Sequence, residues 1–116
     1  MSLPSPLPDE LVELISQRFR VLSEPTRIRL LDSLRGGPAT VSQLQDASGA
    51  SQQNVSKHLS LLLEAGMVRR SKVGARAYYS IADETLFDLC EQVCGNLHRQ
   101  IAQLDAILHP EGEPVP

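Results

Sequence analysis

Apolar residues recur every three or four positions along most of this chain, and that spacing predicts five helices separated by turn residues. The first lies behind Pro8 and opens with Asp9 and Glu10, which favour a helix N-terminus. The second begins at Pro25, a tolerated first-turn position, with Ser23 as its expected cap. The predicted helices cover residues 9–22, 25–35, 41–47 and 52–65, with a last one running from Asp83 or Thr85 to about Leu108.

Cap and turn residues mark the boundaries of the two middle helices. Thr40 or Ser42 is expected to cap the helix over 41–47. The turn ASGA at 47–50 leads to Ser51, the expected cap of the next helix, and Gly66 is expected to end that helix in a left-handed conformation. Two short helices joined by a Gly-containing turn are typical of a helix-turn-helix motif.

The helix over 52–65 has two contrasting faces. Its expected buried stripe is formed by Val55, Leu59, Leu62 and Leu63. The second helix has a similar apolar stripe, formed by Ile28, Leu31 and Leu34. The outward face offers amide, hydroxyl and ammonium groups that can bind base edges and phosphates. Its residues are Gln53, Ser56, Lys57 and Ser60, with Gln52 beside them in the first turn.

After Gly66 the pattern changes to the alternation typical of strands. Residues 67–70 and 77–81 are predicted to form a hairpin with Gly74 at its tip. Lys72 and Arg76 lie on either side of that glycine. The predicted fold is therefore mainly α with a small β-hairpin, a winged helix-turn-helix, whose basic wing can follow the phosphate backbone or enter the minor groove.

Charge is distributed unevenly, which changes the meaning of the net charge of −3 over 116 residues. Residues 52–80 hold five Lys or Arg and one acid, Glu64, a net charge of +4. Residues 81–116 hold one Arg and seven acids, a net charge of −6. A local positive field governs the approach of phosphate, so the acidic total does not exclude DNA as a partner.

The last predicted helix carries a long apolar seam. The seam comprises Leu86, Cys90, Val93, Leu97, Ile101, Leu104 and Leu108, and is flanked by Leu89 and Ile107. It extends about 22 residues, or roughly 33 Å, which is more than so small a domain easily covers. A homodimer formed through the first and last helices would bury it.

Composition indicates one small domain over 9–108, with a flexible, Pro-rich leader at 1–8 and a disordered, acidic tail at 109–116. The chain has no apolar run long enough to cross a membrane, no signal-peptide pattern and only two Cys, so a reducing, cytoplasmic location is expected. It also lacks a Gly-rich phosphate loop, HExxH and GxSxG, so the pattern argues against an enzyme.

Three stretches in this order resemble the ArsR/SmtB family of small winged-helix repressors: LSEPTRIRLLDSL at 22–34, SQQNVSKHLSLLLEAGMV at 51–68 and GARAYYSI at 74–81. The resemblance covers most of residues 10–108. It implies a homodimeric repressor that reads two operator half-sites and leaves the DNA when an inducer binds. Its DNA-contacting positions fall on Gln52, Gln53, Ser56 and Lys57, with Lys72 and Arg76 in the wing.

The sensing sites of that family do not carry over. The thiolate site would need Cys where this chain has Thr40 and Ser42. The site at the two ends of the last helix would fall on Asp83, Thr85, Asn96 and Arg99, of which only the Asp is a plausible ligand. The paired-Cys redox arrangement on two helices is missing too.

Cys90, Cys94 and His98 stand at successive i+4 steps of the last helix. Cys90 with Cys94, or Cys94 with His98, can bind zinc or another thiophilic metal ion if the partner subunit or the first helix completes the site. His98 lies about 12 Å along the axis from Cys90, too far for one ion to bind both. The alternatives are buried thiols that only pack in the dimer seam, and redox chemistry.

Two other functions remain open at this point. A winged helix can serve protein contact instead of DNA, in which case binding would depend much less on salt. A DNA-binding regulator can also respond to an organic small-molecule inducer, or to none, in which case the thiols would have no effect on operator affinity.

Overall fold

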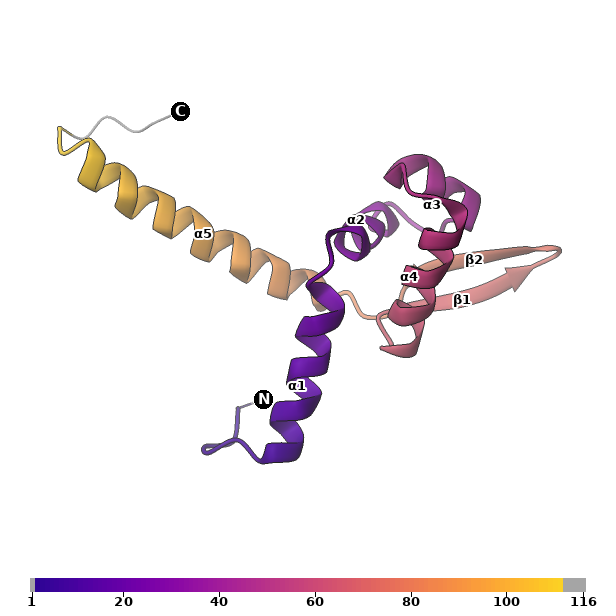
Figure 1. Cartoon of the computed structure of the whole chain (residues 1–116), viewed down its shortest axis with the longest axis horizontal. Coiled ribbons are helices and arrows are strands. Elements are labelled where there is room, and N and C mark those ends of the chain that lie inside the picture. Colours follow the sequence, from indigo (N-terminus) through magenta and orange to yellow (C-terminus); the bar gives the residue numbers. More distant parts are fainter. Residues whose placement is uncertain (1, 112–116) are drawn as a thin grey trace. The chain divides into compact units, whose positions relative to one another are not determined.

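The computed structural model describes residues 2–111 and confirms the predicted order of five helices and one hairpin (Figure 1). The elements are α1 (Asp9–Leu22), α2 (Pro25–Leu34), α3 (Val41–Ser48), α4 (Gln52–Glu64), β1 (Val68–Val73), β2 (Arg76–Ile81) and α5 (Leu86–Leu108). The chain divides into two units between Asp83 and Glu84, so α5 forms a unit by itself. No helix within the described residues is long and apolar enough to span a membrane.

The core of the first unit lies where α2, α3, α4 and the base of the hairpin meet. It is apolar throughout and consists of Leu30, Leu31, Leu34, Leu44, Val55, Leu59, Leu62, Met67, Val68 and Tyr79. Ala39 pairs with Tyr79, and their backbone N–H and C=O groups exchange hydrogen bonds of 2.8 and 3.0 Å. This bridge fastens the chain before α3 to the outer edge of β2.

Two expected core residues lie elsewhere. Ile28 is 46% exposed, and Leu30 takes its place in the core. Leu30, Leu31 and Leu34 define the buried face of α2. At 100° per residue, Ile28 points about 110° away from the centre of that face, measured around the helix axis. Leu63 of α4 is 40% exposed for a similar reason, because it lies at the edge of the stripe formed by Val55, Leu59 and Leu62.

Side-chain caps mark the starts of α2, α3 and α4. Ser51 accepts a hydrogen bond from the N–H of Asn54 at 3.2 Å, and Thr40 forms a reciprocal capping box with Gln43. Ser23 does not cap α2 as expected. Its hydroxyl donates to the Arg20 carbonyl at the end of α1, and Glu24 is the N-cap of α2. Of the two candidates for α3, Thr40 is the cap and Ser42 is not.

The hairpin is longer than the sequence pattern predicts. The ladder pairs Val68 with Ile81 at its base and Val73 with Arg76 at its tip, leaving only Gly74 and Ala75 in the turn. Gly74 has a φ of 63°, the positive value that a two-residue II′-type turn needs at its first position. Residues 71–73 therefore extend β1 where a longer turn was predicted.

The flanking segments lie mostly outside these elements. Residues 2–8 form neither helix nor strand, and the part of the tail at 112–116 lies outside the described residues. The flexibility of the leader and of the tail remains a prediction.

Candidate nucleic-acid interface

α4 presents its polar side away from the core. Val55, Leu59 and Leu62 are buried, whereas Gln53 and Lys57 are exposed on the opposite side. Gln52 and Ser60 are also exposed, and Ser56 is half-buried. Within residues 2–111 the side chains of Gln53 and Lys57 show no hydrogen bond to the protein, so their donors and acceptors are available to a ligand.

Ser60 differs from its neighbours on this face. Its Oγ donates to the Ser56 carbonyl at 2.9 Å, one turn earlier in the helix. The hydroxyl proton is thereby used inside α4, and only the oxygen lone pairs remain for a partner. Of the five predicted α4 residues, Ser60 has the least to offer a base edge.

The hairpin places its two predicted cations on opposite faces. Side chains alternate along a strand and directly paired residues share a face. Lys72 therefore shares a face with Val68 and Tyr79, and Arg76 points to the other. In Figure 1 the β1–β2 ribbon extends beyond the helices of its unit, so both cations lie on a projecting arm. Such an arm can contact phosphates on two sides.

Arg76 lies beside the start of α3. With Ala77 and the residues from Thr40 to Gln43 it lines an open hollow of about 430 Å³. The first N–H groups of a helix have no partner inside the helix and carry a partial positive charge. A guanidinium and a helix N-terminus facing one hollow are a suitable arrangement for a backbone phosphate.

Two arginines of β1 were missing from the predicted site. Arg70 is exposed and, two residues before Lys72, shares its face of the ribbon. Arg69 is exposed on the other face, where its Nη2 donates to the Ala82 carbonyl at 3.1 Å. Side chains alternate along a strand, so a strand predicted over residues 68–73 would have placed Arg70 on the same face as Lys72. The predicted strand ended at Arg70, and Lys72 was assigned to the turn.

A polar cluster lies behind α4, on the side facing α2. Glu24 Oε2 accepts from the Arg27 N–H at 3.1 Å and lies 3.7 Å from His58 Nε2. Burial pulls the pKa of Glu24 upward, but the Arg27 N–H, the charge of His58 when protonated, and the N–H and hydroxyl of Thr26 outweigh it. The pKa of Glu24 therefore lies below its ordinary value of 4.5.

Acid should remove the contribution of Glu24 to stability. Because its pKa is lower in the folded than in the unfolded chain, the contribution is complete above the unfolded value and is lost as the pH falls through the folded one. We expect the difference in unfolding free energy between wild type and Glu24→Gln to shrink between about pH 5 and pH 3, measured by urea unfolding at fixed protein concentration. Glu13→Gln, at an exposed α1 carboxylate, is the control. A difference that stays constant over this range would contradict the assignment.

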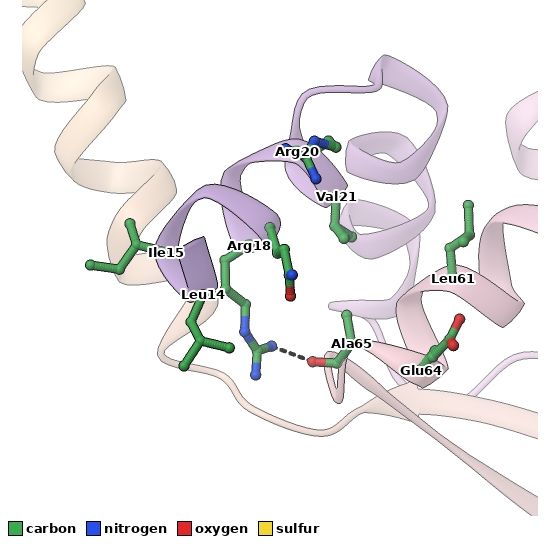
Figure 2. Close-up of a pocket in the computed structure, with 9 residues that line it drawn as sticks. Leu14, Ile15, Arg18, Arg20, Val21, Leu61, Glu64 and Ala65 are labelled. Carbon is green, nitrogen blue, oxygen red and sulfur yellow. Dashed lines mark hydrogen bonds between the residues drawn. The ribbon is translucent and has the colours of Figure 1, made fainter. Parts of the chain in front are cut away.

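A second hollow lies between α1 and the end of α4 (Figure 2). It has a volume of about 580 Å³. Its lining residues are Leu14, Ile15, Gln17, Arg18, Arg20 and Val21 of α1, Leu61 and Glu64 of α4, and Ala65, the C-cap of α4. Figure 2 shows Arg18 reaching across it to donate to the Ala65 carbonyl. A cation bound there satisfies a C-terminal carbonyl of α4 and suits the negative end of the helix dipole.

In α5, Cys90, Cys94 and His98 are all exposed, and both thiols are free. Among the described residues of one chain, no three His, Cys, Asp or Glu side chains gather closely enough to hold a metal ion. The predicted metal site is thus not complete within a single copy, and it remains a prediction.

Comparison with known proteins agrees with this arrangement. The profile of a helix-turn-helix domain matches residues 22–71. The transcriptional regulator NmtR of Mycobacterium tuberculosis is 30% identical over 88 residues, which cover 76% of this chain and 73% of NmtR. A solved domain of Mb0332 from Mycobacterium bovis has a TM-score of 0.69 at 28% identity, covering 84% of this chain and 93% of that one. It is described as a homodimeric winged helix-turn-helix DNA-binding domain and a possible ArsR-family regulator.

The chain belongs to the ArsR/SmtB family of winged helix-turn-helix transcriptional regulators. Another family member, KmtR of M. tuberculosis, is 36% identical over 81 residues. The match covers 70% of this chain but only 62% of KmtR. These relatives are named as transcriptional regulators, and their names assign no enzymatic activity.

Proposed function

We propose that the protein is a homodimeric, cytoplasmic repressor that binds operator DNA, with α4 in the major groove and the β1–β2 wing against the adjacent backbone. The observation that carries the proposal is the outward face of α4, where Gln53 and Lys57 are exposed on the same unit as the cations of the wing. Gln can read adenine edges and Lys can bind guanine edges or phosphate. Lys72 and Arg76 would hold the backbone on either side of the projecting arm.

Dimerisation is supported by the apolar surface that one copy leaves uncovered. α5 buries none of its residues, and Ile101 is 66% exposed. The large apolar side chains exposed on α5 are Leu89, Val93, Leu97, Ile101, Leu104, Ile107 and Leu108, and those on α1 are Val12, Leu14 and Phe19. A second copy is the occupant we propose, since the similar Mb0332 domain is described as homodimeric.

Salt dependence of duplex binding tests the proposal. Fluorescence anisotropy would compare DNA from upstream of the coding sequence with a scrambled duplex between about 50 and 300 mM salt. If Lys57, Lys72 and Arg76 of both subunits each neutralise one phosphate, the slope of log affinity against log salt is about −5. A protein-contact module would show a much smaller slope. A stable monomer without salt-sensitive duplex binding would overturn the proposal.

For the inducer, we propose a thiophilic metal ion such as zinc, bound by Cys90 and Cys94 and completed by the partner subunit. Two thiols one helical turn apart can share an ion, and both are exposed in a single copy. His98 stands one turn beyond Cys94 and provides an alternative pair with it. The ion would favour a dimer arrangement in which the two α4 helices no longer match the operator.

Zinc titration of the reduced protein, followed by equilibrium dialysis, tests the thiol site. We expect bound zinc to disappear in Cys90→Ser/Cys94→Ser and to decline at acidic pH, because thiolate binding releases protons. The same zinc should weaken operator binding by wild type and spare the double variant, with His109→Gln as the control. Equal zinc binding by wild type and double variant would assign the thiols to packing. Parallel additions of peroxide and of apolar organic compounds would then identify a redox or organic inducer.

A further inference from the structure

A single guanidinium joins α1 to the recognition helix. Arg27, in the first turn of α2, donates from Nε to the Val21 carbonyl at 2.6 Å and from Nη2 to the Arg20 carbonyl at 3.5 Å. Both carbonyls belong to the last turn of α1. The third nitrogen, Nη1, lies 3.4 Å from Nδ1 of His58, in the middle of α4. Arg27 of α2 therefore contacts two other helices, α1 and α4, and links all three.

His58 lies between a cation and a carboxylate, Arg27 and Glu24. Only 14% of its side chain is exposed, and its Nε2 faces Glu24 Oε2 at 3.7 Å. A guanidinium can only donate hydrogen bonds, so the Arg27 contact is a hydrogen bond only when Nδ1 of His58 carries no proton. The proton of a neutral ring would then be on Nε2, the atom that faces Glu24.

A second contact ties α1 to the C-terminal end of α4. Arg18 donates to the Ala65 carbonyl across the hollow of Figure 2. α1 is thus connected to α4 at two points along α4: at His58 through Arg27, and at the C-terminal end through Arg18. A change in the tilt of α4 relative to α1 must break or lengthen one of these contacts.

We propose that Arg27 and His58 are positioning residues that transmit the placement of α1 to α4, and that they do so only while the imidazole is neutral. The inference rests on the proposed function, in which α1 contacts the partner subunit and α4 reads the operator. His58 is well placed for this role because it directly follows Lys57, a predicted DNA contact. Unlike Val55 and Leu59, which are fully buried in the core, His58 keeps part of its side chain exposed.

The charges around His58 make the link sensitive to pH. An imidazole is the side chain that ordinarily changes charge between about pH 5 and 8. A proton on Nδ1 removes the acceptor of Arg27 and brings two cations together, while the attraction to Glu24 grows. The other charged groups on these three helices are Asp9, Glu10, Glu13, Arg18 and Arg20 of α1, Arg29 and Asp32 of α2, and Lys57 and Glu64 of α4. Acid should therefore release His58 from Arg27 and draw it toward Glu24.

The measurement is the ratio of operator affinity to random-duplex affinity at fixed salt, from about pH 8 to pH 5.5, on the full chain. A ratio is needed because added positive charge strengthens binding to any duplex. This nonspecific effect raises both affinities alike and therefore cancels in the ratio. We expect the wild-type ratio to fall about 5-fold or more on acidification. In His58→Gln the ratio should not change with pH, whereas His109→Gln should keep the wild-type profile.

Arg27→Lys gives a second test that does not depend on the fold of the His58 variant. Lysine keeps the charge but cannot reach three acceptors with a fixed fork, so the ratio at pH 8 should fall by a similar factor. The inference is overturned if the wild-type ratio is independent of pH, if His58→Gln keeps the wild-type profile, or if Arg27→Lys lowers only the melting temperature. If wild type does not distinguish operator from random duplex at pH 8, the proposed function fails instead.

Discussion

Leu97→Glu should convert the protein to a monomer and reduce operator affinity by about two orders of magnitude or more. Leu97 lies in the middle of the α5 seam, between Val93 and Ile101. In the proposed dimer, each carboxylate would be buried against apolar side chains of the partner subunit without a counter-charge. A monomer then binds one half-site, and the gain from joining two sites, about 10²–10⁴, is lost.

Gln103→Glu is the matched control, since it adds the same charge to α5 on the polar side of the helix. Light scattering with size-exclusion chromatography would give the mass, and far-UV circular dichroism would confirm that the helices remain. We expect the control to stay dimeric with nearly unchanged affinity. If Leu97→Glu remains a dimer of normal affinity, the seam is not the subunit interface.

Local signals in the sequence were sufficient to predict the boundaries of α3 and α4 to within one residue. Ser51 and Gly66 carry out their roles through bonds and dihedral angles within a few residues of their own position. The same holds for Thr40, whose capping box with Gln43 is complete. Such features depend little on the rest of the molecule, so a sequence pattern is enough to find them.

Features that depend on distant parts of the chain were not predicted. The exposure of Ile28 and the burial of Leu30 follow from the directions in which α3 and α4 lie around α2, and periodicity alone does not contain those directions. The contact of Arg27 with His58 joins residues 31 positions apart. The sequence shows both residues but not their proximity, because only the packing of three helices brings them together.

The candidate interface was predicted in outline because its residues follow from one helix face and one hairpin. The alternation of β1 would also have revealed Arg70, had the strand been predicted at its full length. The opposite orientation of Lys72 and Arg76 depends on the register, which in turn depends on the two-residue turn at Gly74. Strand ends are the point at which sequence reasoning was least accurate here.

Replacing Lys57, Lys72 and Arg76 together by Gln should weaken binding to every duplex and remove most of its salt dependence. Each substitution removes one phosphate contact per subunit, so the slope of log affinity against log salt should become less negative by about two for each position. The loss should be nearly equal for operator and random DNA, because phosphate contacts carry no sequence information directly. Anisotropy titrations over a range of salt concentrations measure the slope and both affinities.

Two variants make the result specific to the interface. Arg29→Gln removes a positive charge from an exposed position on α2, and we expect it to leave the slope unchanged. Gln53→Ala should do the opposite of the triple variant: it should keep the slope but reduce the preference for the operator by about 1–3 kcal/mol, the free energy of one good base contact. If the triple variant retained the wild-type slope, the cations of α4 and the wing would not touch phosphate. The polar face of α4 would then have to serve a partner other than DNA, because groove reading by Gln53 requires the backbone held beside it.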